Sequence, residues 1–179
     1  MDTTSAAATD QIKNYSLGGA IVELTDITRL AELYDVFLLD CDGVLWRGSS
    51  IIDRAFDVVN WLSETLGKKV FFLTNSSGRT REEYVEKIRK FGFKSCTKEM
   101  IYGSAYTTAQ YLREKHPDIK KVHVVGMNSI RKEMAEVGID SRGGEDHEGF
   151  SHGKFMSLDE FEAYQLDPEV QAVVVGLDT

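Results

Sequence analysis

The sequence predicts an α/β fold in which helices cover a doubly wound, mainly parallel β-sheet. Two observations lead to this prediction. Short apolar segments that read as strands alternate along the chain with longer amphipathic segments that read as helices. The first of these strands, VFLLD at residues 36–40, opens with four successive apolar residues. Such a run is typical of a strand buried on both faces of a parallel sheet, and strands that alternate with helices form βαβ units.

The elements of the first part of the chain begin at Thr25. This threonine can cap a short helix over residues 25–34, and the strand at 36–40 follows directly. After this strand we expect, in order, a helix over 53–66, a strand over 68–74, a helix over 79–92 that ends at Gly92, a short strand around 99–102 and a helix over 104–116. Short connections that contain glycine separate these segments and support the alternation.

A second unit is expected to begin after Pro117. It contains a strand over 120–126, a helix over 128–138, an irregular loop over 138–156, a helix over 158–165 opened by a capping box of Ser157 and Glu160, and a strand over 169–176. We therefore expect a flexible N-terminal extension at residues 1–24, the first part of a core domain at 25–116 and the first part of a second domain at 117–179. The last expected strand, at 169–176, lies at the end of the sequence, and no covering element follows it. Because a strand of a parallel sheet needs such an element, we expect the chain to be a fragment.

The composition excludes several classes of protein. The 179 residues carry a net charge of −8, with basic residues scattered among acidic ones, so neither nucleic acid nor an anionic membrane is an expected partner. No apolar window is long enough to span a membrane, and the N-terminal segment does not resemble a signal peptide. Cys41 and Cys96 are far apart and form no CxxC motif, so a reducing, cytoplasmic location is expected.

Polar residues gather where two of the expected strands end. Asp40 ends the first strand and Asp42 lies two residues later, and Thr74 ends the second strand. Ligands of open α/β sheets bind at the carboxyl ends of the strands, so these side chains should share one crevice. Asp-x-Asp-Gly stretches taken alone are most often turns. A second strand that ends in Thr74 and Asn75 makes a shared site the better interpretation here.

The two aspartates need a cation or a shared proton. Two carboxylates about 4 Å apart repel each other by roughly 4 kcal/mol at an effective dielectric constant near 20. Mg²⁺ is usually held by one or two carboxylates together with a substrate phosphate, so Asp40 and Asp42 are its expected ligands. Gly43 allows a sharp turn and offers an amide to an anion. With the hydroxyl and amide groups that follow Thr74, these residues predict a phosphoryl-transfer site.

These stretches resemble a known family. VFLLDCDGVLW at 36–46 and VFFLTNSSGRT at 70–80 closely resemble the first two motifs of the haloacid dehalogenase (HAD) superfamily of phosphatases. GSAYTTAQYL and VVVGLDT further resemble its subgroup of 4-nitrophenylphosphatase, phosphoglycolate phosphatase and pyridoxal phosphate phosphatase. The resemblance implies a Rossmann-like core with an inserted α/β cap domain, and a phosphatase that acts on small phosphorylated metabolites with Mg²⁺ as cofactor.

The resemblance also implies roles for individual residues. Asp40 corresponds to the nucleophile that forms an aspartyl-phosphate, and Asp42 to the general acid and base, whose backbone carbonyl also contacts the metal. Thr74 and Asn75 correspond to residues that bind the phosphoryl group. Relatives in the family commonly dimerise through the cap, so a homodimer is possible for this protein. The candidate substrates are phosphoglycolate and pyridoxal phosphate, with 4-nitrophenyl phosphate as an artificial substrate.

Two departures from the family pattern limit these expectations. No residue after Thr74 matches the lysine of the third motif or the acidic fourth motif, so we expect these 179 residues to be inactive alone. The position that is often a second asparagine in motif two is Ser76. Two rival functions stay open: a catalytically inactive remnant that serves as a binding protein, and a phosphoacceptor similar to a response-regulator receiver. Receivers, however, carry the phosphorylated aspartate on a later strand than the acidic pair.

Two residues beside the aspartates have two interpretations each. Cys41 is either an oxidation switch next to the nucleophile or, as we favour, a small buried apolar residue. Trp46 either stacks on the substrate or packs the loop beneath the cap, and the sequence does not decide between them.

Overall fold

The computed structural model describes residues 27–144, 157–163 and 167–176, and the chain divides into two compact units, 1–35 and 36–179. The described part of the first unit is helix α2 (Ile27–Leu33), whose end is marked by a 2.9 Å hydrogen bond from the Tyr34 amide to the Leu30 carbonyl. This helix was expected from the sequence. The predicted extension at 1–24 and the predicted cap at Thr25 lie outside the described residues.

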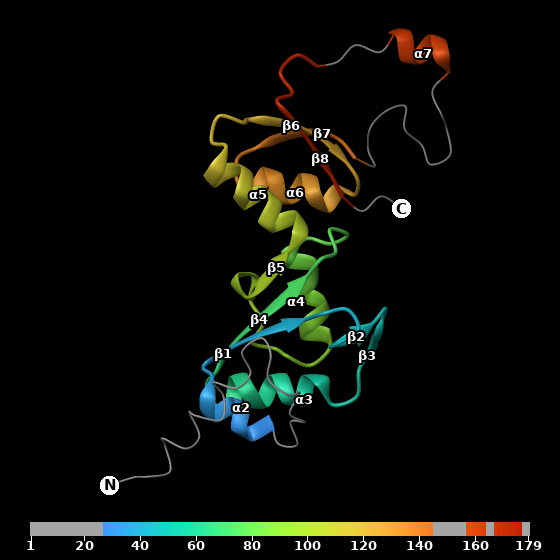
Figure 1. Ribbon diagram of the computed structural model, residues 1–179. Helices are drawn as coiled ribbons and strands as arrows, with labels where there is room; N and C mark the ends of the chain where they lie inside the picture. The colour runs from blue at the N-terminus through green and yellow to red at the C-terminus, as the bar shows by residue number, and fades with distance from the viewer. Residues whose placement is uncertain (1–26, 145–156, 164–166, 177–179) are drawn as a thin grey trace, which may run out of the picture. The chain divides into compact units, whose positions relative to one another are not determined.

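The first sheet of the second unit is parallel. Its strands are β1 (Val36–Asp40), β4 (Lys69–Thr74) and β5 (Ile101–Gly103), in the order β1-β4-β5 (Figure 1). In the register between the first two strands, Asp40 is paired with Leu73, and Thr74 is paired with Gly103 on the third strand. The strand ends that carry Asp40 and Thr74 therefore lie at the same edge of the sheet, as the sequence predicts.

Helices cover one face of this sheet. Buried side chains of β4 and β5 point toward this side, namely Val70, Phe72 and Ile101. The helical elements are α3 (Ala55–Asn60), which continues into the π-helix η2 (Trp61–Thr65), α4 (Arg81–Lys90), and the 3₁₀-helix η3 (Lys98–Met100). Burial of the apolar side of α4, at Tyr84, Val85 and Ile88, anchors it in this core.

The opposite face of the first sheet is apolar and open to solvent among the described residues. Leu38 is 64% exposed, and Val36, Leu73 and Tyr102 are exposed beside it. The sequence predicts a strand buried on both faces at 36–40, and in the described chain only one of these faces is covered. Parallel sheets are usually covered on both faces.

The second sheet is also parallel and has β6 at its centre. The order is β7-β6-β8, with β6 at Lys121–Val125, β7 at Asp140–Gly143 and β8 at Ala172–Val175. Helices α5 (Ser104–Lys115) and α6 (Asn128–Glu136) pack on it (Figure 1). One apolar cluster joins these elements, and its buried members are Ala105, Ala109, Leu112, Val122, Val124, Ile130, Met134, Ile139 and Val174. A further helix, α7 (Leu158–Ala163), follows β7 in the chain.

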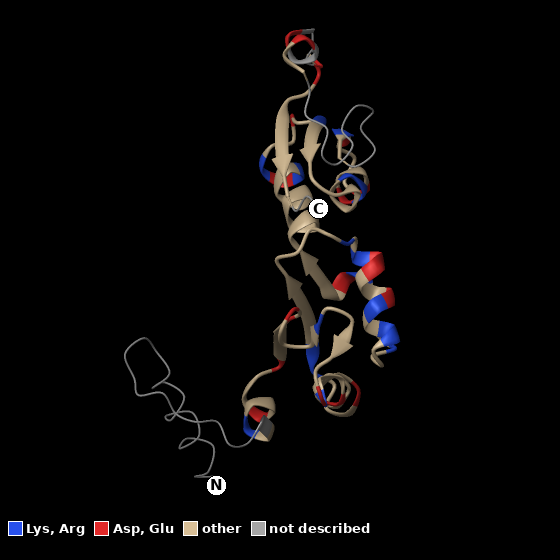
Figure 2. Cartoon of the chain, turned by 90° about the vertical axis from the view of Figure 1, so that its right-hand side faces the viewer, with Lys and Arg blue, Asp and Glu red and all other residues tan. Residues whose placement is uncertain are grey.

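The predicted parallel α/β fold is confirmed, and two elements are additional. Strand β7 lies in the stretch that was expected to be an irregular loop, and a hairpin of β2 (Trp46–Arg47) and β3 (Ser50–Ile51) follows the first strand. The predicted boundary after residue 116 stays a prediction, although the packing groups α5 with the second sheet. Figure 2 shows charged residues gathered mainly on the helices, whereas the strands are drawn mostly in tan. No described helix is long and apolar enough to cross a membrane.

Candidate active site

A tight turn follows β1 and carries the second aspartate. The Cys41 carbonyl accepts hydrogen bonds from the amides of Leu45 (2.9 Å) and Trp46 (3.3 Å). The amide of Gly43 donates to the Trp46 carbonyl at 2.7 Å, and Gly43 has a φ of +88°. Only glycine adopts this φ readily, which explains the residue in the turn. Contact of the Gly43 amide with an anion, as predicted, would require that this hydrogen bond be given up.

The Asp42 carboxylate is held by side chains from two parts of the chain. Its Oδ1 accepts a hydrogen bond of 2.7 Å from the indole Nε1 of Trp46. Its Oδ2 accepts a longer one of 3.3 Å from the hydroxyl of Thr74, which ends the neighbouring strand β4. The structure therefore links two of the predicted site residues, Asp42 and Thr74, directly.

The segment after β4 is held largely by its own side chains. Thr74 is buried, and its Oγ1 accepts a hydrogen bond of 3.1 Å from the Ser76 amide. The Ser76 hydroxyl in turn accepts one of 3.2 Å from the Gly78 amide. Such local bonds from hydroxyl side chains are typical of tight turns. They give the segment a defined conformation although it lies outside the strand.

The same segment then starts α4 with a capping box. The Thr80 hydroxyl accepts from the Glu83 amide at 3.3 Å, and the Glu83 carboxylate accepts from the Thr80 amide at 2.9 Å. This reciprocal pair satisfies two backbone donors at the helix start.

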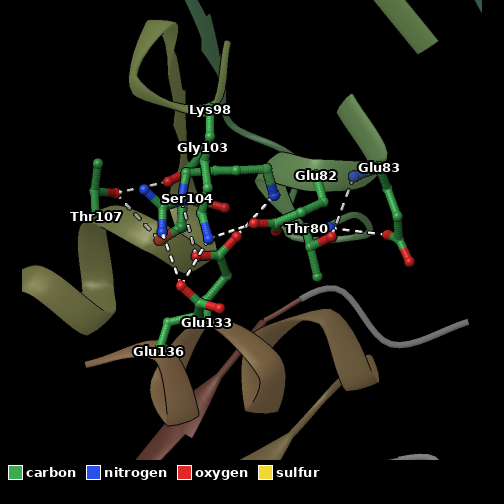
Figure 3. A network of polar contacts seen from close by, with 10 residues as sticks. Thr80, Glu82, Glu83, Lys98, Gly103, Ser104, Thr107, Glu133 and Glu136 are labelled. Carbon is green, nitrogen blue, oxygen red and sulfur yellow. Dashed lines mark hydrogen bonds and ion pairs between the residues drawn. The ribbon is translucent and has the colours of Figure 1, made fainter. Parts of the chain in front are cut away.

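Helix α6 contacts the start of α4 through a buried carboxylate. Glu133 is 1% exposed, and it accepts hydrogen bonds from the backbone amide (2.7 Å) and the Nε (3.0 Å) of Arg81. One turn earlier on α6, the Ser129 hydroxyl donates to the Ser77 carbonyl. Figure 3 shows Glu133 and Glu136 of α6 facing the segment that contains Thr80, Glu82 and Glu83. The segment after β4 is thus bound to residues about 50 positions further along the chain.

A cavity of about 580 Å³ lies at the carboxyl ends of β1, β4 and β5. Asp40, Thr74 and Asn75 line it, together with apolar side chains of the open sheet face and with residues Gly103, Ser104 and Thr107. Three of the five predicted site residues therefore share one cavity. Asp42 is connected to it through its hydrogen bond to Thr74, and Gly43 is not among the lining residues.

The donor set at the end of β1 suits a divalent cation such as Mg²⁺. Both side-chain oxygens of Asp42 already accept hydrogen bonds, so its contribution to a metal would be the backbone carbonyl, beside the carboxylate of Asp40. In the described part of the chain, no three residues among His, Cys, Asp and Glu are grouped as a metal site. Mg²⁺ keeps several water ligands and needs only one or two protein carboxylates, so this pair fits as part of a site.

Cys41 is a buried apolar residue in this structure. It is 1% exposed. Burial, followed by the charges of Asp42 and Asp40, raises the pKa of its thiol from 9.0 to about 12. Because the thiolate is the reactive form, a thiol with this pKa is inert at neutral pH. The structure favours the interpretation of Cys41 as a small buried side chain over that of an oxidation switch.

Two residues of the site were not predicted for their roles. The sequence does not distinguish stacking from packing for Trp46, and in the structure it is fully buried and donates to Asp42. The sequence did contain one indication of this role, because the indole N–H of Trp46 is a donor four residues after Asp42, on the other side of a turn that contains glycine. Glu133 had no local signal, because its partner Arg81 is 52 residues away.

Comparison with known proteins agrees with this geometry. The family model described as haloacid dehalogenase-like hydrolase matches residues 37–140, more than half of the chain. The chain belongs to the haloacid dehalogenase-like hydrolase family. The resemblance seen in the two aspartate and threonine motifs is thereby confirmed, and the match spans the first sheet, α5, β6 and α6.

Individual members of the haloacid dehalogenase-like family are similar over most of this chain. A phosphoglycolate phosphatase 2 from Arabidopsis thaliana is 37% identical over 88% of this chain and 51% of its own length. A 4-nitrophenylphosphatase from Schizosaccharomyces pombe is 40% identical over 82% of this chain and 48% of its own. The solved p-nitrophenyl phosphatase from Archaeoglobus fulgidus has a TM-score of 0.56 and 27% identity over 60% of this chain and 40% of its own. The chain spans about half the length of the curated relatives it matches.

Proposed function

We propose that the intact protein is a Mg²⁺-dependent phosphomonoester hydrolase that acts on small phosphorylated metabolites through an aspartyl-phosphate intermediate. The observation that carries the proposal is the convergence of Asp40, Thr74 and Asn75 on one cavity, with Asp42 hydrogen-bonded to Thr74. Membership in the haloacid dehalogenase-like family, and relatives named as phosphatases, support the same reaction class.

In the proposed reaction Asp40 and Asp42 have different roles. The Asp40 carboxylate attacks phosphorus while Asp42 gives a proton to the leaving oxygen, so that an aspartyl-phosphate and an alcohol form. Asp42 then takes a proton from the water that attacks this phosphorus, which releases phosphate and restores the Asp40 carboxylate. In this proposal the hydroxyl of Thr74 and the amide of Asn75, which line the cavity, bind phosphoryl oxygens.

The Asp40 carboxylate and the Asp42 carbonyl would hold the metal. When bound, Mg²⁺ neutralises the repulsion between the nucleophilic carboxylate and the phosphate dianion. The chain contributes the stiffness of β1, which keeps Asp40 at the sheet edge next to Thr74 of β4.

The proposal includes further polypeptide in the active protein. The expected lysine and second acidic motif have no counterpart after Thr74 in these residues, and one apolar face of the first sheet is uncovered in the described chain. A covering segment that also supplies these side chains would complete the site. These residues alone are therefore proposed to be inactive.

The names of the relatives suggest the substrate class. Phosphoglycolate is a proposed candidate from the name of the Arabidopsis relative, and 4-nitrophenyl phosphate is the artificial substrate suggested by the yeast and archaeal relatives. Pyridoxal phosphate is a proposed candidate from the resemblance of the sequence motifs alone. A cytoplasmic location and a homodimer formed through the second domain remain part of the proposal.

Steady-state hydrolysis by the full-length protein tests the proposed function. With Mg²⁺ the protein should hydrolyse 4-nitrophenyl phosphate, EDTA should stop the reaction, and Asp40→Asn should abolish it. Asp118→Asn, at an exposed position in the turn before β6, is the matched control and should leave the rate unchanged. Failure of the wild type to hydrolyse the ester, or full activity of Asp40→Asn, would refute the proposal. A stable phosphorylated protein without turnover would instead identify a phosphoacceptor.

A further inference from the structure

Trp46 is fully buried and yet directs its polar group at the active site. Its side chain has 0% exposure, which excludes stacking on a substrate in this structure. Its Nε1 donates to Asp42 Oδ1 at 2.7 Å. This is a charge-assisted hydrogen bond at the short end of its usual range, and it is therefore among the stronger kinds in proteins.

The indole ring is held on several sides. Tyr84 stacks on it with ring centres 6.3 Å apart, and the Phe91 ring lies at 5.8 Å. The Lys87 ammonium lies 4.1 Å from the ring centre and also donates to the Gly48 carbonyl of the hairpin turn. Aromatic and cation–π contacts of this kind restrict the ring orientation. The direction of the Nε1–H bond is therefore set by α4 and the hairpin.

The two oxygens of Asp42 differ in how they are held. Oδ1 is bound by a rigid donor at 2.7 Å, whereas Oδ2 has the longer 3.3 Å contact with the hydroxyl of Thr74. Thr74 lines the cavity. The firmly held oxygen thus contacts a buried ring, and the more weakly held one contacts Thr74, which lines the cavity where substrate is proposed to bind.

We propose that Trp46 is a positioning residue for Asp42: it holds Oδ1 and so leaves Oδ2 to transfer protons. The inference rests on the proposed function. In the first step, Oδ2–H gives its proton to the ester oxygen as the bond between that oxygen and phosphorus breaks. In the second, Oδ2 accepts a proton from the attacking water as the bond between phosphorus and the Asp40 oxygen breaks. Trp46 gives up no proton in either step.

The chemistry of the leaving group separates this role from simple packing. An alkoxide needs a proton to leave, so hydrolysis of an alkyl phosphate depends on a well-placed acid in the first step. A 4-nitrophenolate is a stable anion and leaves without one. Loss of the Trp46 N–H should therefore slow the first step for alkyl phosphates and spare it for 4-nitrophenyl phosphate, whereas the second step is common to both.

The test uses Trp46→Phe in the full-length protein, with Trp61→Phe as the matched control. General acid and base catalysis contributes about 10²–10⁴-fold to such reactions, so Trp46→Phe should lower kcat for phosphoglycolate by about 100-fold with little change in KM. The first-turnover burst of 4-nitrophenolate should keep its rate and amplitude. Trp61→Phe should change neither substrate's kinetics.

Other kinetic outcomes would overturn the inference. If Trp46→Phe lowers the burst amplitude in proportion to kcat, fewer molecules are folded and the role is structural. If it lowers the first-turnover rates for both substrates by the same factor, positioning of the acid is not involved. A wild type that hydrolyses neither ester refutes the proposed function itself, and that result is distinct from both.

A second measurement does not depend on activity. In a ¹H–¹⁵N spectrum of the full-length protein, the Trp46 indole proton, assigned with Trp46→Phe, should lie downfield because it binds a carboxylate. Asp42→Asn should move this resonance upfield and leave that of Trp61 in place. An indole resonance that is unchanged by Asp42→Asn would show that the hydrogen bond is absent and would overturn the inference.

Discussion

Replacement of Glu133 by glutamine tests how firmly α6 is bound to the segment after β4. The carboxylate is 1% exposed and accepts both the backbone amide and the Nε of Arg81. Glutamine has almost the same shape but no charge, and its amide nitrogen cannot accept a hydrogen bond. Glu133→Gln therefore removes the ionic part of a buried pair and leaves its volume in place.

The expected cost follows from what Arg81 retains. Breaking a buried ion pair by removing one partner usually costs about 3–5 kcal/mol. Arg81 keeps the Tyr106 ring at 3.6 Å and a distant Glu136 carboxylate at 3.9 Å, which places the loss near the lower end, about 3 kcal/mol. For a protein of this size that corresponds to a decrease in Tm of about 6–12 °C.

Urea unfolding followed by far-UV circular dichroism measures this cost. Glu136→Gln is the control, because Glu136 lies on the same helix and is 48% exposed, and pairs with this exposure contribute at most about 1 kcal/mol. In a double-mutant cycle with Arg81→Met, the losses of unfolding free energy in the two single variants should sum to clearly more than the loss in the double variant. A Glu133→Gln protein within about 0.5 kcal/mol of the wild type, or equal to Glu136→Gln, would refute the reasoning.

Four further predictions concern local features. Cys41 and Cys96 are both buried, so neither should react with Ellman's reagent until the protein is unfolded by urea. Burial raises the pKa of the Cys96 thiol from 9.0 to about 11. The stability that the buried neutral thiol contributes is therefore complete below pH 9 and should be lost as the pH rises toward 11. Measurement of the free energy of unfolding as a function of pH detects this loss. Arg54, before α3, has a φ of +58°, a conformation that is strained for any residue except glycine. Arg54→Gly should therefore stabilise the protein by up to about 1 kcal/mol and raise Tm slightly, and a lower Tm would contradict this. Thr80→Ala removes the capping hydroxyl of α4 and should cost about 1 kcal/mol in urea unfolding, whereas an unchanged midpoint would show that the cap contributes nothing.

Much of the fold was predictable because its signals are local. Strands β1 and β4 are apolar runs that end abruptly in polar residues, and the amphipathic helix expected over 79–92 is found as α4 at Arg81–Lys90. The convergence of Asp40 and Thr74 followed from a general rule of parallel sheets. None of these inferences needed knowledge of residues distant in the chain.

The features that the sequence did not predict depend on contacts across the chain. Strand β7 has the polar sequence DSRG and forms only because it pairs with β6, where Ser141 is paired with Val122. The hairpin of β2 and β3 has two residues in each strand and is too short for periodicity to detect. The pair of Arg81 and Glu133 joins two helices that are separated by a full βαβ unit. Neither charge has a neighbour in sequence that predicts its burial.

The segment after β4 illustrates why the candidate site is already shaped without a ligand. Its start is tied to Asp42 through Thr74, its middle to Ser129 through the carbonyl of Ser77, and its end to Glu133 through Arg81. The first contact comes from the turn after β1, and the other two come from α6. A loop that is fixed in this way loses little conformational entropy when it binds an anion, so more of the binding energy is kept as affinity. Loosening any one of these contacts should therefore weaken phosphate binding before it unfolds the sheet, because the strand pairing that supports Asp40 does not depend on them.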